Sequence, residues 1–483
     1  MEIKTDRFRE TVQKELVNPE TQKFLSFFPL VLSAMRSATL AGLPDSEAAL
    51  ASAAAIRAEA VERLPELLEE FERNATAAGA RVVWARDSEE ANRYICDLAR
   101  EKKVACVTKG KSMVTEEMGL REELEKAGIE VWETDLGEFI TQLLGLPPFH
   151  IIGPAINVPV ETIRDVFLEK AGLEEPTNDP VQLGYAARIF LREKFYRAEM
   201  GVTGVNIAVA STGTVINVEN EGNIRHCKSG PRIQVSVLSL EKIVPTMRDA
   251  FHMLRVLCMC ATGQSLGTYA SFDTGPRRPG ELDGPEELHI VLLDNGRSAA
   301  YRNPKTRDAL KCIRCAACLS VCPVYGKIGG YPYGWAYSGP MGQVVNPLLL
   351  GLDRTEDLYG ACTLCQRCKA ACPAGIDHPR MLLYYRSRQA EGDSELKGSG
   401  APWSGKALHR FYSAAVRNPA LWKAMAKGLR WAANRYEKDG KISRAPGPAE
   451  GWFRARDLPR FPDRTFHDRW KEIEKTLERG EKP

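Results

Sequence analysis

Apolar and polar positions follow two different periods along the first 300 residues. Between about Asp45 and Ala78, Ala, Leu and Val recur every three or four residues among Glu and Arg, which predicts one long amphipathic helix. Short apolar runs then alternate with helical stretches, and the runs 81–85, 104–108 and 129–133 are predicted strands. Strands and helices that alternate in this way indicate an α/β fold, with a parallel sheet covered on both faces.

The strand pattern continues beyond residue 202. The segments 204–210, 214–218 and 232–238 are rich in Val and Ile and are predicted strands, whereas 244–260 is a predicted helix. A Ser-Thr-Gly turn ending at Gly213 joins the first two strands. This turn can hold a ligand with its backbone amides, or it can be a tight connection that needs a positive φ at the glycine.

Charged residues follow two of the predicted strands. Lys109, Lys111 and Ser112 come after the second strand, Glu133 ends the third, and Asp135 follows it. Lysines beside the free N–H groups of a helix start form an anion site, and ligands of parallel sheets bind at the carboxyl ends of strands. We therefore treat these residues, with Gly213, as a candidate cleft. The alternative is ordinary helix capping by Ser112 and a solvated charge pair.

The most specific chemical signal is a repeated cysteine spacing, C-x2-C-x2-C-x3-C-P. It occurs at Cys312, Cys315, Cys318, Cys322 and Pro323, and again at Cys362, Cys365, Cys368, Cys372 and Pro373. Three cysteines on one short stretch can hold three corners of a cubane cluster, and the fourth is directed toward the other cluster. We predict one 4Fe-4S cluster on Cys312, Cys315, Cys318 and Cys372, and a second on Cys362, Cys365, Cys368 and Cys322.

Zinc and disulfides fit these cysteines less well. Structural zinc usually uses separated pairs of ligands, and disulfides need an oxidising compartment. The N-terminus has no apolar segment directly behind its charges, so we expect no secretory signal and a cytoplasmic protein. The remaining cysteines have no partners at ligand spacing and are predicted to be buried apolar residues: Cys96, Cys106, Cys227, Cys258 and Cys260.

Length and charge add two constraints. A chain of 483 residues with 44% hydrophobic content can form two or three domains, and we find no apolar run near the roughly 20 residues that cross a bilayer. The net charge is +3, but residues 401–483 hold 19 Lys and Arg against 10 Asp and Glu. The rest of the chain is therefore acidic, which argues against nucleic acid as a partner.

The basic tail is also rich in tryptophan. A linker after residue 390 leads to a segment, 421–436, that mixes Lys and Arg with Trp, Met and Leu. This segment is a predicted helix that docks on the cluster-bearing part or on a partner subunit. Contact with an anionic membrane, on its inner face, is the alternative.

Five stretches of the chain resemble the LUD domain of lactate-utilisation proteins. They are 109–117 (KGKSMVTEE), 133–140 (ETDLGEFI), 150–156 (HIIGPAI), 201–223 (GVTGVNIAVASTGTVINVENEGN) and 241–245 (EKIVP). Together with the double cysteine block and the basic tail, the chain resembles the iron-sulfur B subunit of the three-component L-lactate utilisation system. The resemblance implies a sheet similar to ribose-phosphate isomerases and acyl transferases, then a mainly helical two-cluster ferredoxin domain and a basic helical tail.

We accordingly predict domains at 1–305, 306–390 and 391–483. The resemblance implies a non-catalytic electron-transfer subunit with two 4Fe-4S clusters, in a complex that oxidises L-lactate to pyruvate and passes electrons to an acceptor, in one version at the membrane. One alternative is a self-sufficient oxidoreductase that acts on another 2-hydroxy acid or carboxylate in the candidate cleft. Another is an electron relay for a different dehydrogenase complex.

Overall fold

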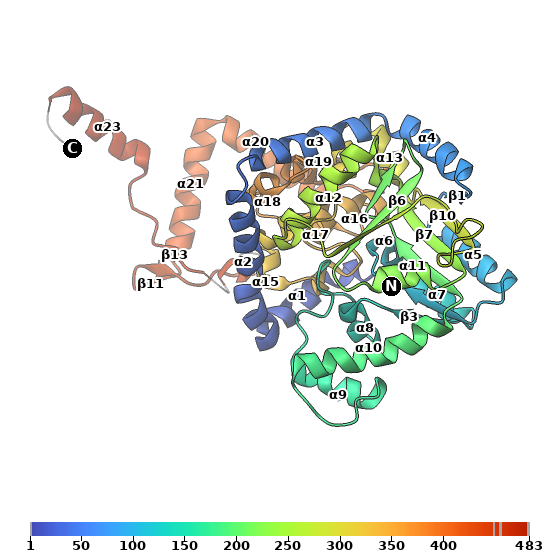
Figure 1. Cartoon of the computed structure of the whole chain (residues 1–483). Coiled ribbons are helices and arrows are strands. Elements are labelled where there is room, and N and C mark those ends of the chain that lie inside the picture. Colours follow the sequence, from blue (N-terminus) through green and yellow to red (C-terminus); the bar gives the residue numbers. More distant parts are fainter. Residues whose placement is uncertain (1, 448–449, 454–455, 481–483) are drawn as a thin grey trace. The chain divides into compact units, whose positions relative to one another are not determined.

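The computed structural model describes residues 2–447, 450–453 and 456–480 (Figure 1). The chain divides into two compact units, Met1–Gly400 and Ala401–Pro483. The predicted boundary between residues 305 and 306 lies inside the first unit, so the division of that unit into two domains stays a prediction.

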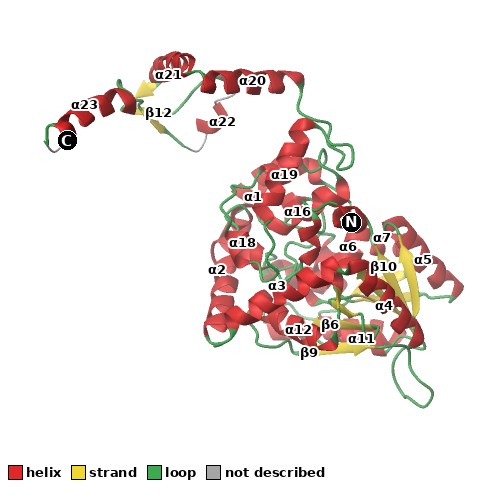
Figure 2. Ribbon diagram, turned by 90° about the horizontal axis from the view of Figure 1, so that it is seen from above, coloured by secondary structure: helices red, strands yellow, loops and turns green. Residues whose placement is uncertain are grey.

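The first unit contains a six-stranded parallel sheet with strand order β1-β10-β7-β4-β2-β3. Figure 2 shows the strands, β10 among them, on one side of this unit. Its strands are β1 (Arg81–Ala85), β2 (Cys106–Lys109), β3 (Glu130–Glu133), β4 (Met200–Gly204), β7 (Ile233–Ser239) and β10 (Glu287–Leu293). The predicted α/β class with a parallel sheet is confirmed.

Helices precede, separate and follow these strands. They are α1 (Phe8–Val17), α2 (Pro19–Ala41), α3 (Ser46–Glu62), α4 (Leu64–Ala77), α5 (Ser88–Glu101), α6 (Met113–Met118), α7 (Leu120–Lys126), α8 (Leu136–Leu144), α9 (Val160–Lys170), α10 (Pro180–Arg197), α11 (Asn223–Ser229), α12 (Met247–Thr262) and α13 (Arg297–Arg302). The prediction of one helix over 45–78 was wrong, because the chain breaks at Arg63 between α3 and α4. Pro65 has no N–H to donate to the Val61 carbonyl of a continuous helix, but it is tolerated in the first turn of α4.

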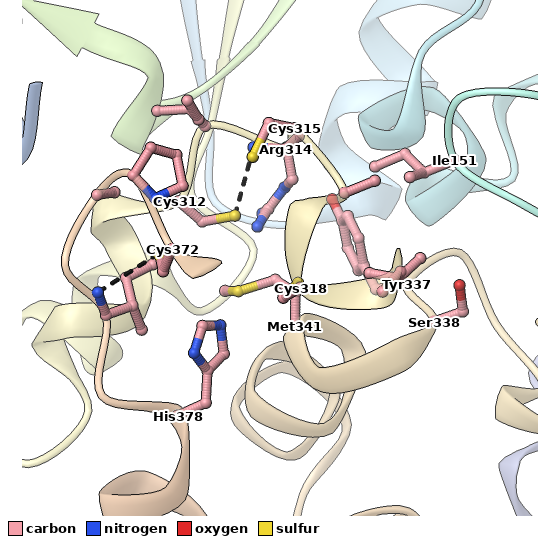
Figure 3. A pocket seen from close by; sticks show the side chains of 16 residues that line it. Ile151, Cys312, Arg314, Cys315, Cys318, Tyr337, Ser338, Met341, Cys372 and His378 are labelled. Carbon is pink, nitrogen blue, oxygen red and sulfur yellow. Dashed lines mark hydrogen bonds between the residues drawn. The ribbon is translucent and has the colours of Figure 1, made fainter. Parts of the chain in front are cut away.

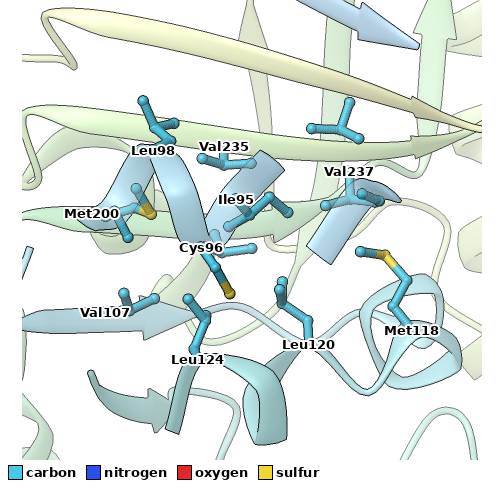
Figure 4. Close-up of a cluster of buried hydrophobic side chains, with 14 of the residues drawn as sticks. Ile95, Cys96, Leu98, Val107, Met118, Leu120, Leu124, Met200, Val235 and Val237 are labelled. Atoms are coloured by element: carbon cyan, nitrogen blue, oxygen red, sulfur yellow. The ribbon is translucent and has the colours of Figure 1, made fainter. Parts of the chain in front are cut away.

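The alternation of side chains along β10 shows how the two faces of the sheet are filled. Leu288, Ile290 and Leu292 belong to the hydrophobic cluster that contains α4 residues. Val291 and Leu293 belong to the opposite cluster, where α5, α6 and α7 supply apolar side chains (Figure 4). Burial on both faces explains why the strands read as nearly continuous apolar runs.

A second, four-stranded sheet has the order β8-β5-β6-β9, with β5 (Ile207–Val209), β6 (Thr214–Glu219), β8 (Ile243–Val244) and β9 (Tyr269–Asp273). The segment 204–210, predicted as one strand, is therefore divided between the end of β4 and β5. Gly213 has φ +68°, and a Cβ there would lie 2.2 Å from the backbone nitrogen of Ala75. The turn is thus a tight connection against α4, and its glycine is needed for both reasons.

Helix α2 corrects the expectation about apolar length. It has 23 residues, and among the described residues it alone is long and apolar enough to cross a membrane, with a hydropathy of 1.4 over 18 residues. Core helices and signal sequences share these features, and α2 packs against α12 and against the short helices of the cysteine region. Its composition is therefore weak evidence for a span.

The cysteine region is helical, as predicted, with α14 (Ala317–Ser320), α15 (Tyr325–Ile328), α16 (Gly339–Leu350), α17 (Glu356–Gly360), α18 (Arg367–Ala371) and α19 (His378–Glu391). Four 3-10 turns complete the first unit: η1 (Thr5–Arg7), η2 (Leu240–Lys242), η3 (Arg307–Lys311) and η4 (Tyr331–Tyr333). The second unit contains α20 (Trp403–Arg417), α21 (Pro419–Asn434), α22 (Glu450–Phe453), α23 (Phe466–Glu478) and a small antiparallel sheet of β11 (Glu437–Lys438), β12 (Lys441–Ile442) and β13 (Leu458–Pro459). Helix α21 confirms the helix predicted at 421–436.

Candidate metal centres and an adjoining cavity

The two cysteine blocks fold in the same way. Arg314 and Ala316 in the first block, and Leu364 and Gln366 in the second, have positive φ values of 62°, 59°, 56° and 67°. Left-handed backbone is costly for residues other than glycine and persists where the surrounding structure requires it. Each block then enters a short helix, α14 or α18, that carries its third cysteine. The same strained course therefore presents the first three thiols of each block.

One pocket gathers three thiols of the first block and one of the second (Figure 3). It is lined by Cys312, Cys315, Cys318 and Cys372. Backbone N–H groups donate to two of these sulfurs, from Arg314 to Cys312 at 3.3 Å and from Ile376 to Cys372 at 3.4 Å. Burial raises the pKa of Cys315 and of Cys318, and the neighbouring thiols raise it further. Such a set can lose its protons together only around a cationic centre, so the residues present fit a metal cluster.

The other four cysteines of the blocks lie near one another as well. Burial is the main reason why the pKa of Cys322 is raised, and the thiols of Cys362 and Cys365 add to the effect. Burial and the same neighbours raise the pKa of Cys368 to about 12. The Leu364 N–H donates to Cys362 at 3.3 Å, which repeats the contact of the first block. Cys365 is exposed, so this set reaches the surface.

A buried network of charges ties the first cysteine block to the sheet domain. Arg297 donates to Glu241 at 2.7 Å and to both oxygens of Glu117 at 2.9 and 2.7 Å. Arg314 donates to the other oxygen of Glu241 at 3.0 Å and lies over the ring of Tyr337 at 4.6 Å. The Tyr337 hydroxyl donates to Glu117 at 2.6 Å. Burial alone would raise the pKa of Glu241, but the two arginines hold it at about 2.

A cavity of about 290 Å³ lies beside the first cysteine pocket and shares Arg314 and Tyr337 with it. Three predicted cleft residues, Lys111, Ser112 and Asp135, line this cavity. Lys111 pairs with Asp135 at 3.0 Å, and Ser112 caps α6 as predicted. The carboxyl ends of β2 and β3 thus contribute to one cavity.

The other predicted cleft residues lie elsewhere. Lys109 and Glu133 are register partners in β2 and β3, and their buried side chains form an ion pair at 2.9 Å. Glu133 borders a different cavity, of about 360 Å³. Gly213 lies against α4 and lines neither cavity. The residues of the candidate cleft therefore lie in three separate places. Lys111 and Asp135 follow the strand ends, Lys109 and Glu133 are still within the strands, and Gly213 lies against α4.

Comparisons with known proteins cover almost the whole chain. Sequence models match in succession: the LUD domain at residues 68–293, the 4Fe-4S dicluster domain at 308–376, and the C-terminal region of lactate utilisation protein B at 384–475. A protein of Bacillus licheniformis named lactate utilization protein B is 41% identical and aligns over 98% of each chain. The chain belongs to the lactate utilization protein B family. Proteins of the same name from Bacillus subtilis and Anoxybacillus flavithermus are 39% and 38% identical, over 99% and 97% of this chain and 98% of each relative.

Membership of the lactate utilization protein B family establishes the cofactors. The dicluster match contains both cysteine blocks, and the protein therefore carries two 4Fe-4S clusters. A crystal structure of a DUF162 family protein from Deinococcus radiodurans aligns over 48% of this chain and 98% of its own, with 14% identity and a TM-score of 0.28. That score is too low to support an argument.

Sequence reasoning missed two residues of the cavity. Lys242 and Asn217 line it on the side of the second sheet. Lys242 belongs to the EKIVP stretch that carries part of the family resemblance, but a lysine between Glu241 and Ile243 has no local pattern that marks it as a cavity residue. Burial lowers its pKa to about 7.

Lys109 lies among three carboxylates. Its Nζ is 3.0 Å from Glu116, 2.9 Å from Glu133 and 3.7 Å from Glu138. Neither oxygen of Glu138 has a hydrogen-bond partner among the described residues. Burial raises the pKa of Glu138 well above its usual value, and the ammonium of Lys109 offsets only part of this effect. Folding therefore favours the neutral, protonated form of Glu138.

The variant Glu138→Gln should become more stable relative to the wild type as the pH rises. A carboxyl group whose pKa is raised by folding stabilises the folded state fully below its unfolded pKa, and this stabilisation is lost as the pH rises toward the folded pKa. The loss is at most about 1.4 kcal/mol per pH unit, and glutamine does not suffer it. Anaerobic thermal unfolding measures the difference from pH 4.5, the ordinary glutamate pKa, up to mildly alkaline pH, and a constant difference over this whole range would contradict the expectation.

Proposed function

We propose that the protein is the iron-sulfur electron-transfer subunit of a complex that oxidises L-lactate to pyruvate. The observation that carries this proposal is the pairing of the two cysteine blocks, in which three thiols of one block share a pocket with the last thiol of the other. The relatives are named for lactate utilisation, and that name supports the substrate.

We assign the ligands by the same pairing. One cluster takes Cys312, Cys315, Cys318 and Cys372, and the other takes Cys362, Cys365, Cys368 and Cys322. When bound, each cluster accepts and releases single electrons. Buried aromatic side chains pack around the cysteines and exclude water from them: Tyr325, Tyr333, Trp335 and Tyr337.

The two sets have different surroundings, and this difference suggests an order of electron transfer. The first set lies beside the cavity of the sheet domain, whereas the second reaches the surface at Cys365. We propose that a partner subunit of the complex exchanges electrons at this exposed cysteine. Free thiolate ligands need a reducing compartment, so we place the protein in the cytoplasm. An acceptor at the inner face of the membrane is compatible with this placement.

Pyruvate formation from L-lactate with an artificial acceptor tests the proposal. We expect the isolated, fully loaded chain to produce no pyruvate and the chain with its co-purifying partners to produce it. Turnover by the chain alone, at the rate of the complex, would instead make it a self-sufficient oxidoreductase.

The charge of Arg367 should affect the reduction potential of the second cluster. This residue lies between Cys365 and Cys368 and is exposed, and no described residue forms an ion pair with it. The change Arg367→Glu replaces a positive by a negative charge, which disfavours the added electron, and should lower the potential of this cluster by a few tens of millivolts. A dye-mediated redox titration followed by EPR measures the shift. The same change at distant Arg93 serves as the control, and equal potentials in both variants would contradict the expectation.

A further inference from the structure

The cavity of about 290 Å³ has two basic side chains, Lys242 and Arg314, with spare hydrogen-bonding capacity on the side of the first cysteine set. Lys242 is 9% exposed and makes no hydrogen bond or ion pair with any described residue. Arg314 uses Nη2 for Glu241, while its buried Nη1 has no partner among the described residues. Buried donors without partners are costly, and a charged donor more so. Both groups line the cavity.

The carboxylates of the cavity do not satisfy these donors, because each already has other partners. Asp135 is bound to Lys111 at 3.0 Å. The two oxygens of Glu219 accept from the backbone N–H groups that follow β6, at 2.6 and 3.0 Å. Glu221 accepts from the Leu136 N–H at 3.2 Å. The cavity thus combines acidic groups that have partners with basic groups, Lys242 and Arg314, that have hydrogen-bond donors to spare.

The cavity is also lined by a hydrogen-bond acceptor that has no partner in the described part of the chain. Asn217 is 2% exposed, and its Nδ2 donates to the Gly204 carbonyl at 2.8 Å. This contact leaves Oδ1, which has no partner among the described residues. A ligand that complements the cavity therefore offers negative oxygens to Lys242 and Arg314, and a hydroxyl hydrogen to Asn217.

We propose that this cavity binds a small hydroxycarboxylate, with its carboxylate on Lys242 and Arg314 and its hydroxyl on Asn217, directly beside the first cysteine set. This proposal goes beyond electron transfer, and it rests on the proposed function for the presence of the clusters and for the choice of L-lactate as a probe. The site is an effector site: it needs no reaction in the cavity.

A ligand bound at this site lowers the reduction potential of the neighbouring cluster. A bound anion repels the added electron, so the ligand binds the oxidised protein more tightly than the reduced protein. A tenfold preference corresponds to about 59 mV for a one-electron couple. The shift falls on the cluster of the first cysteine set, because the pocket of that set shares Arg314 and Tyr337 with the cavity.

The experiment uses the fully loaded chain under anaerobic conditions. Calorimetry measures the binding of L-lactate, and an EPR-monitored redox titration is carried out with and without 2-hydroxyisobutyrate, which has no α-hydrogen and cannot be oxidised to a keto acid. The test variants are Lys242→Met and Asn217→Leu. Lys311→Met is the control, because it removes a lysine charge next to Cys312, whereas Lys311 does not line the cavity.

We expect one binding event per chain, a lower potential for the first cluster only, and binding at least about tenfold weaker in Lys242→Met and Asn217→Leu but unchanged in Lys311→Met. Three results would overturn the proposal: no binding heat and no shift, equal binding by Lys242→Met, or equal competition by phosphate and acetate, which would indicate an unspecific anion site. If binding fails while lactate still reduces the clusters in the complex, only this inference falls. If the reconstituted protein binds no iron-sulfur clusters, the proposed function falls.

Discussion

Replacing Cys322 by alanine is expected to remove the cluster of the second cysteine block and to leave the cluster of the first. The reason is the crossed pairing, in which the fourth cysteine of each block belongs to the other set. Iron should fall from about eight to about four atoms per chain, and the remaining EPR signal should match that of Cys365→Ala. The reciprocal change, Cys372→Ala, should match Cys315→Ala.

Each of the four variants serves as a control for the other three. Each removes one thiol, and each carries the same number of cysteines, so differences between them report only which cluster is lost. If Cys322→Ala instead matched Cys315→Ala, the fourth cysteine would serve its own block and the proposed ligand assignment would be wrong.

Replacing Arg297 by methionine should cost about 3 to 5 kcal/mol of folding free energy. The arginine bridges Glu117 and Glu241, which are both buried, and its loss leaves their charges without a main counter-ion. Because Glu241 also holds Arg314 beside Cys312, we expect the first cluster to become more labile as well. Anaerobic denaturant unfolding and the rate of cluster loss measure the two effects.

A surface arginine provides the control for this variant. Arg93 forms an exposed ion pair with Glu89 at 2.8 Å, one helical turn away. The change Arg93→Met should cost no more than about 0.5 kcal/mol, because water screens such pairs. Equal costs for the two variants would show that the buried network does not hold the cluster loop.

The parts of the fold that depend on local pattern could be predicted from the sequence. Strand β1 is a short apolar run in the sequence, and its predicted bounds, 81–85, agree with the structure, as does the capping of α6 by Ser112. Pro65 divides the predicted long helix, a signal that was present in the sequence but was outweighed by the periodicity. Cys312, Cys315, Cys318 and Cys372 line one pocket, and the ligand assignment to the two clusters stays a prediction.

The candidate cleft could not be predicted in the same way, because its contacts join distant segments. Lys109 and Lys111 are two residues apart, yet the strand ends between them and their side chains enter different surroundings. Arg314 belongs to the cysteine block but also lines the cavity of the sheet domain through its pairing with Glu241. No local pattern records a contact between residues 73 positions apart.

EPR of the anaerobic protein after addition of L-lactate tests the central claim most directly. The loaded chain is mixed with lactate, alone and then with its co-purifying partner proteins. The electron-transfer account predicts that both clusters stay oxidised in the chain alone and become reduced with the partners. Clusters that stay oxidised in the complete mixture, while dithionite still reduces them, would contradict the account.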